Sequence, residues 1–503
     1  MRIHVPMAIN SDAYTVSSED LESQDCKDWS CYNLTNRYSP RDVFSCADDS
    51  RMVMYGISDF IRNYLIDPIL KYDIDEAEEF MNRAHIKGVM PFNRKMWDTI
   101  ARDYKFLPIS IRAIPEGSTF FPNEPIIEVN SAYGFGQLAA LIEPLLVGMV
   151  SLGTARATLT RHLFNKLAQF TQRVHPSWTK KKVYETVSWL IHDFGMRTGV
   201  GEESELLGKA HLLCFNGTDS FNAAYQAYKL GCKPETGKSI LALAHRIVQG
   251  FDNEVDSYEN LYQQCSTSKI GSFVADCYDF RNAVSNYLLD LAKRKDVTIV
   301  VRPDSGDYLD NVAFIVKTAM SAALYDMDEL NRPTGNYMKF ISGDSMNYEK
   351  IMNTLVALEK DGFDPVGWGL FGVGGWLRNS CTRDILSTAY KLCAKGMQAK
   401  PVCKLTEGGK ASIPGLTTLN NLGDGKPSVH SVKGDGFDFD GKKLYYSNQL
   451  SLYWCQERFS LVQDRAMYDF DRFNLDPNYG LNSSCLSPEV VELQESLKMK
   501  YGV

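Results

Sequence analysis

The sequence has no apolar run long enough to cross a membrane. Its most hydrophobic stretch, residues 138–153, is interrupted by Glu143 and Pro144, whereas a membrane-spanning helix needs about 20 predominantly apolar residues. The first residues, MRIHVPMAINSDAY, also lack the apolar segment of a secretory signal peptide. We therefore expect a soluble protein without an export signal.

Cysteine and histidine do not form any familiar pattern. The 12 cysteines include no C-x-x-C pair, and the eight histidines do not cluster near them. This spacing indicates neither a zinc site nor a disulfide framework. Unpaired cysteines are typical of a reducing compartment, so the predicted localisation is cytoplasmic.

Runs of lysine and arginine are absent as well. The chain has 54 basic and 62 acidic residues, which give a net charge of −8. A protein with this charge distribution is a poor candidate for non-specific binding to nucleic acid or to anionic membranes. Anionic small molecules remain possible partners, because a few local arginines and lysines can outweigh a mild net charge.

A chain of 503 residues is too long for one ordinary core, so two domains are expected. Short β-rich runs broken by proline and glycine in residues 109–130 indicate an antiparallel module. Residues 1–150 and 386–503 are predicted to form one mixed α+β domain from the two ends of the chain. Residues 151–385 are predicted to form a second domain.

Residues 189–385 contain six short apolar runs, each followed by a stretch with helical periodicity. Six such units in succession predict an α/β fold with an irregular parallel α/β barrel. In such a barrel the residues that follow the strands meet at one rim, where the active site forms. These junction residues are Asp219, His245, Asp276, Asp304, Asp344 and Gly374, at intervals of 26, 31, 28, 40 and 30 residues.

Four of the junction residues are aspartates, and each alone has a common structural explanation. An aspartate after a strand often caps the next helix by accepting hydrogen bonds from its first backbone N–H groups. Four acids on one rim, however, repel one another unless a polyhydroxyl ligand or a hard cation such as Mg²⁺ offsets them. With a phosphate site nearby, they indicate a sugar phosphate as ligand.

A glycine-rich segment, GVGGWL at 372–377, follows a strand-like run and opens a helical one. Gly374 and Gly375 would let a phosphate approach the backbone, where free N–H groups and the helix dipole attract anions. Arg383, about two helical turns further on, could add a charge-assisted contact. The alternative is a tight turn that needs glycine only for its backbone conformation.

Two arginines and a histidine complete the candidate site. Arg302 follows five strand residues and precedes a rigid proline, and Arg197 lies in the segment HDFGMR. Arginine suits the bidentate binding of anions. His245 closes an apolar run and could be a general acid, a phosphate contact or a structural histidine. Phe194 on its own would be assigned to the core.

The segments HDFGMR, NGTDS, RPDSGD, SGDS, FGVGG and TRD follow one another along the chain. In this order they resemble the motifs of the type II phosphoribosyltransferases, in the branch that acts on nicotinamide and is related to nicotinate phosphoribosyltransferase. The resemblance implies an irregular α/β barrel beside a mixed domain, in a homodimer with shared active sites. It also implies that phosphoribosyl passes from phosphoribosyl pyrophosphate to nicotinamide, with Mg²⁺, giving nicotinamide mononucleotide and pyrophosphate in NAD salvage.

The resemblance further implies how the base is held. The pyridine ring would stack between Phe194 and Tyr14 of the partner subunit, an arrangement that offset aromatic rings favour. The carboxylate of Asp219 would accept a hydrogen bond from the carboxamide NH₂. A carboxylate at this position repels nicotinate but satisfies nicotinamide, so nicotinamide is the predicted substrate and nicotinate the alternative.

The other site residues are carried over from the same motifs. Catalysis is assigned to His245, Arg302 and Asp304, because the departing pyrophosphate needs charge stabilisation and the reaction needs no covalent nucleophile. Mg²⁺ is expected near Asp276, without an assigned ligand. The expected substrate contacts are Asp304, Ser305, Gly343 and Asp344 around the ribose, Gly374, Gly375 and Arg383 at its 5′-phosphate, Arg197 at the pyrophosphate, and Lys391 and Lys404 at phosphate groups of the neighbouring subunit.

Four positions depart from the family's pattern. Ala244 precedes His245 where the family usually has glutamate, and Val373 and Trp376 replace a serine and a glycine of the glycine loop. The family also places a pair of basic residues in the amino-terminal module, where this sequence offers only Arg51. In the family ATP can phosphorylate the histidine, so the missing glutamate and the missing basic pair argue against ATP as a cofactor, which stays an open alternative.

Two hypotheses from other functional classes stay open. A sugar-phosphate lyase or isomerase could use an ordinary barrel, but a Schiff-base aldolase needs a lysine at a strand end, and none of the six junctions has one. A non-catalytic pyridine-nucleotide binder would keep the pocket without turnover.

Overall fold

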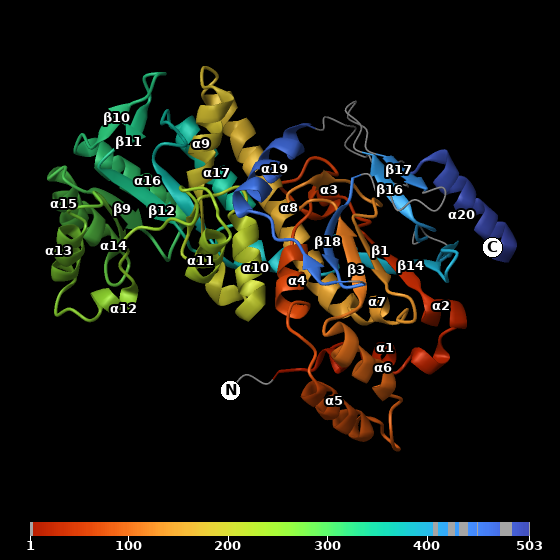
Figure 1. Cartoon of the computed structure of the whole chain (residues 1–503). Coiled ribbons are helices and arrows are strands. Elements are labelled where there is room, and N and C mark those ends of the chain that lie inside the picture. Colours follow the sequence, from red (N-terminus) through yellow and green to blue (C-terminus); the bar gives the residue numbers. More distant parts are fainter. Residues whose placement is uncertain are drawn as a thin grey trace. The chain divides into compact units, whose positions relative to one another are not determined.

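The structure is a computed structural model of the chain, and it describes residues 4–405, 411–420, 428–431, 441–449, 451–472 and 485–501. The chain divides into two compact units, one of Met1–Leu159 with Cys381–Val503 and the other of Thr160–Ser380 (Figure 1). These boundaries lie nine residues after and five residues before the predicted ones at 150 and 385.

The first unit is built around a seven-stranded antiparallel sheet that combines both ends of the chain. Its strand order is β15-β14-β1-β5-β3-β18-β19. Because β14 pairs along the whole of β1 and β18 pairs along β3, both chain ends are needed to complete the sheet. Its strands are β1 (Ser30–Thr35), β3 (Ile109–Ala113), β5 (Ile127–Ser131), β14 (Ala389–Lys395), β15 (Lys400–Pro401), β18 (Lys443–Ser447) and β19 (Tyr453–Trp454).

The long helix α8 (Glu143–Val174) starts in this unit and ends in the other. Pro144 stands in its first turn, where the missing N–H of proline leaves no intrahelical hydrogen bond unmade. The break in the most hydrophobic stretch therefore marks the start of a helix. The other elements of the unit are α1 (Ala13–Val16), α2 (Gln24–Asp28), α3 (Pro40–Val43), α4 (Ile57–Tyr64), α5 (Lys71–Ala84), α6 (Arg94–Thr99), α7 (Leu138–Leu141), α19 (Phe459–Arg472), α20 (Pro488–Tyr501), and the strand pairs β2 (Met52–Val53) with β4 (Thr119–Phe120) and β16 (Thr417–Asn420) with β17 (Ser428–Ser431).

The second unit contains a six-stranded sheet in which every pair of neighbouring strands is parallel. The strand order is β7-β6-β13-β12-β9-β8. Single parallel bridges join Lys238 to Gly217 and Ala242 to Ser272, so the segment between them connects the two edge strands. The sheet therefore curls into an irregular parallel α/β barrel, which confirms the predicted fold class. Its strands are β6 (Ile191–Asp193), β7 (Gly217–Thr218), β8 (Ile270–Val274), β9 (Thr298–Arg302), β12 (Met338–Ser342) and β13 (Gly369–Val373).

The barrel strands are buried on both faces, which explains why they read as short continuous apolar runs. Ile299, Val301, Met338, Phe371 and Val373 are fully buried. Helices follow the strands along the chain, and residues 323–337 form a hairpin of β10 (Tyr325–Met327) and β11 (Pro333–Gly335). The helices are α9 (Lys180–Leu190), α10 (Gly201–His211), α11 (Phe221–Lys229), α12 (His245–Val248), α13 (Glu254–Gln264), α14 (Phe280–Asn282), α15 (Leu289–Lys293), α16 (Tyr308–Ser321), α17 (Tyr348–Lys360) and α18 (Gly375–Asn379).

Among the helices of the described residues, none combines the length and the apolar character that crossing a bilayer requires.

Candidate functional site

The carboxyl ends of the barrel strands surround a pocket of about 980 Å³. Residues that follow β6, β7, β9, β12 and β13 meet there, as expected where parallel strands end at one rim. The structure thus brings together nine of the predicted site residues: Phe194, Arg197, Asp219, Arg302, Asp304, Gly343, Asp344, Gly374 and Gly375.

A second cavity of about 320 Å³ lies inside the barrel and shares Phe194, Asp219 and Arg302 with the first. These three residues therefore lie where the polar pocket meets the interior of the barrel. The wall of the second cavity is otherwise mainly apolar and includes Trp189, Ile240, Ala242, Ile270, Val300, Ile341 and Leu370.

The ring of Phe194 rests on glycines. Its backbone N–H donates to the carbonyl oxygen of Val373 at 3.0 Å, which holds it beside β13. A Cβ at Gly372 would overlap the ring, and a Cβ at Gly343 would lie 3.1 Å from its Cε2. Glycine at these positions therefore gives the aromatic ring a flat seat at the edge of the pocket.

None of the strand-end aspartates at 276, 304 and 344 caps the helix that follows it. The caps are supplied by other residues, each three positions later, whose side chains accept the first backbone N–H groups. The explanation of these aspartates as helix caps is therefore wrong, and their carboxylates make contacts other than helix capping. The caps are Asp279 for α14, Asp307 for α16 and Asn347 for α17.

Asp219 borders both cavities, with its side chain about half exposed. Its Oδ1 accepts a hydrogen bond from the hydroxyl of Ser239 at 2.5 Å and lies 3.1 Å from Nε2 of His192. Burial raises the pKa of Asp219, but these hydrogen bonds and the charge of Arg302 outweigh it and hold the pKa below its usual value. The carboxylate is therefore ionised at neutral pH.

Both side-chain oxygens of Asp276 are occupied by hydrogen bonds, and its side chain is only 7% exposed. Oδ1 lies 3.2 Å from Nε2 of His245, while Oδ2 accepts from the backbone N–H of Asp304 at 3.2 Å and from the hydroxyl of Ser305 at 2.5 Å. Nδ1 of His245 lies 3.8 Å from Oδ2 of Asp304. Asp276 thus orients His245 and the RPDSGD turn, and Asp304 faces the pocket.

Arg302 ends β9 with its side chain 18% exposed. A terminal nitrogen lies 3.8 Å from Oδ2 of Asp304, and Nε is buried without a hydrogen-bond partner in the described part of the chain. A buried donor without an acceptor is costly. The arrangement therefore suits a ligand that brings anionic oxygens to this guanidinium.

The glycine loop leads into a helix shorter than predicted. Gly374 precedes α18, which begins at Gly375 and ends at Asn379. The two helical turns expected between the glycines and Arg383 are not formed, since Arg383 lies four residues beyond the end of α18. Arg383 belongs to the first unit, where it pairs with Asp384 at 2.6 Å.

Three further predicted site residues also belong to the first unit. Tyr14, on α1, is 72% exposed. Lys391, on β14, lies 3.9 Å from Glu143, and Lys404 is exposed. Arg51, the candidate for the basic pair, is held by Asp49 at 2.7 Å and by the ring of Phe470. Site roles for the first three residues rest on the resemblance.

Several residues of the site were not found from the sequence. The sequence could have indicated His192, which precedes Phe194 by two positions. Residues two apart on a strand point to the same face. No sequence motif marks Ser239. Its hydroxyl reaches Asp219 only because the barrel curls and brings the two residues together. Trp376, which departs from the family's pattern, lines the pocket, as do Met196, Thr198, Ser345, Met346, Asn347 and Asn379.

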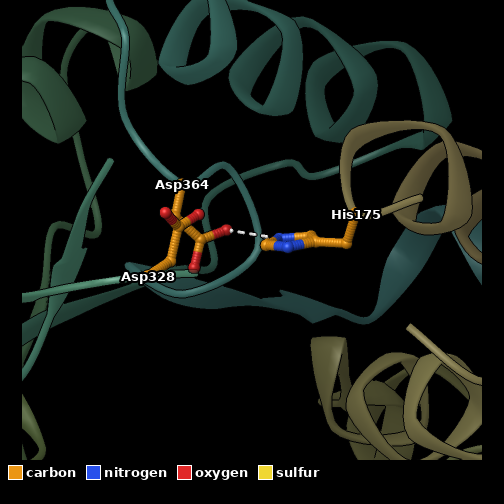
Figure 2. A group of neighbouring side chains, drawn as sticks. All are labelled: His175, Asp328 and Asp364. Atoms are coloured by element: carbon orange, nitrogen blue, oxygen red, sulfur yellow. Dashed lines mark hydrogen bonds and ion pairs between the residues drawn. The ribbon is translucent and has the colours of Figure 1, made fainter. Parts of the chain in front are cut away.

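Figure 2 shows a further group of ionisable side chains, His175, Asp328 and Asp364, whose ligand-type atoms lie within 4.8 Å of one another. The ring nitrogens of His175 lie 3.0 Å from Asp364 and 2.8 Å from Glu329. Arg332 pairs with Asp328 at 2.7 Å. Since charged partners already occupy these donors and acceptors, the group is an ion-pair cluster that ties the end of α8 to the β10–β11 hairpin.

Comparison with known proteins gives consistent matches. Residues 189–405 match the nicotinate phosphoribosyltransferase (NAPRTase) family. The chain is 30% identical over 383 residues to the nicotinamide phosphoribosyltransferase of Xanthomonas campestris pv. campestris, covering 73% of this chain and 79% of that protein. It is 26% identical to the protein of the same name from Acinetobacter baylyi, covering 68% and 73%. A nicotinate phosphoribosyltransferase of Mycobacterium tuberculosis is 29% identical over 287 residues, covering 56% and 51%.

Solved structures resemble the fold over nearly the whole chain. Human nicotinic acid phosphoribosyltransferase aligns with a TM-score of 0.60 at 14% identity, covering 97% of this chain and 100% of that chain. The nicotinate-nucleotide pyrophosphorylase of Pyrococcus furiosus aligns with a TM-score of 0.60 at 13% identity, covering 95% and 99%. At these identities the likeness concerns the fold alone.

Proposed function

The chain belongs to the nicotinate phosphoribosyltransferase family, as a phosphoribosyltransferase of NAD salvage, and from this premise we propose that its base substrate is nicotinamide. The observation that carries the proposal is Asp219, a carboxylate with a lowered pKa beside the ring of Phe194. An ionised carboxylate accepts a hydrogen bond from an amide NH₂ but repels the carboxylate of nicotinate. Two relatives named nicotinamide phosphoribosyltransferase support it.

The reaction we propose joins the pyridine nitrogen to C1 of the ribose as pyrophosphate leaves. The ring nitrogen is already nucleophilic, so the protein supplies position and charge rather than a covalent group. Phe194 would hold the ring, and the carboxylates of Asp304 and Asp344 at the pocket would bind ribose hydroxyls. Arg302 and Arg197 would face the pyrophosphate.

Mg²⁺ is proposed as the metal of this reaction. It binds few protein ligands and prefers substrate phosphates with one or two carboxylates. Asp304 and Asp344 both line the pocket and fit this demand, whereas both oxygens of Asp276 are taken by hydrogen bonds. When bound, Mg²⁺ would neutralise charge on the pyrophosphate. Asp276 would instead orient His245, which would lie at the pyrophosphate side of the ribose.

The resemblance also supports a cytoplasmic homodimer in which Tyr14 of the partner subunit covers the base. The high exposure of Tyr14 suits this role. Arg383 would contribute to binding of the 5′-phosphate, and Lys391 and Lys404 would reach phosphate groups of the neighbouring subunit. ATP coupling through His245 is proposed only as an optional reaction, to be measured with and without ATP.

The direct test is product formation from nicotinamide and from nicotinate, with phosphoribosyl pyrophosphate and Mg²⁺. We expect nicotinamide to be preferred, and Asp219→Ser to lower kcat/KM for nicotinamide about 10- to 100-fold, because a hydrogen bond to a charged group is lost. Equal or better use of nicotinate by the wild type would contradict the proposal. Binding of the mononucleotide without turnover would indicate a non-catalytic binder.

Nicotinate is the second candidate because Arg302 borders the same inner cavity as Asp219. A guanidinium there could offset a substrate carboxylate. The Asp219→Ser variant separates the two substrates, since it removes the repulsion without removing the arginine. If nicotinate were the natural substrate, this variant would leave the wild-type base preference unchanged.

A substitution under Phe194 tests the base platform. Gly372→Ala is expected to raise the KM for nicotinamide about tenfold and leave the KM for phosphoribosyl pyrophosphate little changed, because the added methyl displaces the ring and overpacking costs about 1–3 kcal/mol. Steady-state kinetics with each substrate varied in turn measures the effect. Gly148→Ala, within helix α8, adds a methyl where no atom lies within 4 Å and where φ is not positive. It serves as the control, and an equal rise in both KM values would contradict the platform.

A further inference from the structure

His192 lies on the strand that leads to Phe194. It is the middle residue of β6 and pairs with Gly217 of β7. A Cβ at Gly217 would overlap the imidazole at Nδ1. Glycine at this position therefore creates the space that the ring of His192 occupies.

The imidazole of His192 contacts both parts of the base site. Its ring packs edge-on against Phe194, with centroids 5.4 Å apart and planes at 66°. Its Nε2 lies 3.1 Å from Oδ1 of Asp219. The side chain of His192 is 13% exposed and borders the inner cavity together with Asp219. Any movement of this ring therefore alters the platform and the carboxylate together.

Two donors converge on one oxygen of Asp219. An ionised carboxylate only accepts hydrogen bonds, so Nε2 of His192 carries the proton that lies between it and Oδ1. The hydroxyl of Ser239 donates to the same Oδ1 at 2.5 Å. No hydrogen bond from a described residue reaches Oδ2 of Asp219. Oδ2 is therefore the oxygen available to an incoming amide.

We propose that His192 is a positioning residue that sets the base preference, by holding Asp219 so that Oδ2 faces the carboxamide. The inference rests on nicotinamide as the substrate. Without the imidazole, the carboxylate can rotate and turn toward Arg302, which borders the same cavity. The amide then loses its oriented acceptor, while Arg302 still acts on the pyrophosphate and Asp304 on the ribose. Loss of His192 therefore weakens binding of nicotinamide and lowers the preference for nicotinamide over nicotinate.

The first arm of the test compares the variants His192→Ala and His192→Gln. In His192→Ala the KM for nicotinamide is expected to rise about tenfold, with a similar fall in preference over nicotinate, because a hydrogen bond that orients a charged group is lost. The kcat stays nearly unchanged. The amide NH₂ of His192→Gln can donate to Asp219 and restores most of the preference. His85→Ala, an exposed histidine in the other unit, is the control.

The second arm uses Gly217→Ala, whose methyl displaces the imidazole from its seat. It is expected to reproduce the rise in KM of His192→Ala. In the double variant His192→Ala/Gly217→Ala the second change adds nothing, because the ring that the methyl would strike is gone. Such non-additivity is the signature of a direct contact. Additive losses, accompanied by a lower kcat and melting temperature, would instead assign His192 a structural role and overturn the inference.

The outcomes separate the inference from the proposed function. If the wild type converts nicotinamide and His192→Ala keeps the same KM and base preference, the inference is overturned and the function stands. If the wild type does not convert nicotinamide, both are overturned. A raised KM that His192→Gln rescues, with non-additivity between His192 and Gly217, supports the inference.

Discussion

Replacing Arg302 with methionine is expected to lower kcat about 100- to 1,000-fold, as the loss of one preorganised group that stabilises developing charge does in other enzymes. Negative charge accumulates on pyrophosphate as its bond to ribose C1 breaks. Arg302 is enclosed, with a buried Nε that lacks a hydrogen-bond partner in the described residues. Methionine keeps much of the length and apolar packing of the side chain but carries no charge.

The effect should fall mainly on kcat because the leaving group carries more charge in the transition state than in the bound substrate. Arg302 also helps to lower the pKa of Asp219. Measurements at about pH 8, well above the ordinary carboxyl range, keep Asp219 ionised in the variant and so isolate the effect on the leaving group.

Arg302→Lys is the matched variant for this prediction. Lysine keeps the positive charge but not the planar fork, so an intermediate kcat is expected, about tenfold below the wild type. Steady-state kinetics with saturating substrates gives kcat directly. A methionine variant with normal kcat and a raised KM for phosphoribosyl pyrophosphate would show that Arg302 binds the substrate and the transition state equally, and would contradict the prediction.

The barrel and most of its rim could be predicted from the sequence because a βα unit leaves a local signature. Five of the six junction residues lie one or two positions after a strand, such as Asp304 after β9 and Asp344 after β12. The run before His245 forms only an isolated bridge at Ala242, and His245 itself begins α12. β6 was not counted among these runs, because three residues are too few to show a period. The helix caps were also overlooked, although Asp307 stands only three residues after Asp304.

The finer parts of the site depend on contacts between strands and could not be read locally. Phe194 alone resembles a core residue, and only the register of β6 beside β13 places its ring over Gly372. Likewise, nothing near Ser239 in the sequence indicates that its hydroxyl reaches Asp219. The family motifs indicated the residues predicted to touch the ligand, whereas the residues that pack against them could be identified only from the fold.

The contact between Asp364 and His175, which belongs to none of the sequence motifs, is expected to contribute strongly to stability. Asp364 is buried and accepts hydrogen bonds from His175 at 3.0 Å, from the hydroxyl of Thr334 at 2.8 Å and from the backbone N–H of Val366 at 3.2 Å. His175 is fully buried and stacks on Trp178, with ring centroids 3.8 Å apart. Figure 2 shows His175 facing the two aspartates. Removing the carboxylate leaves a buried imidazolium without its main partner.

The sign of the pH dependence follows from the two pKa shifts. Burial lowers the pKa of His175, but the carboxylates of Asp364 and Glu329 outweigh it and raise the pKa above its usual value. This stabilisation is complete below about pH 6.5, the ordinary histidine pKa, and is lost as pH rises through the folded-state pKa. Burial raises the pKa of Asp364, but the hydrogen bonds from His175 and Thr334 and the charge of His175 outweigh it and hold the pKa below its usual value. Its contribution is present above about pH 4 and is lost in stronger acid.

Asp364→Asn is therefore expected to destabilise the protein by about 3 kcal/mol between about pH 4 and 6.5, since the buried imidazolium loses one of its two carboxylate partners. The difference from the wild type should shrink as pH rises and His175 loses its proton. Unfolding midpoints measured across this pH range test both statements. Asp361→Asn, an exposed aspartate three residues earlier, is the control and should shift stability by less than about 0.5 kcal/mol. A constant difference at all pH values would mean that His175 is neutral in the folded protein, so that the cluster is held by ordinary hydrogen bonds instead of an ion pair.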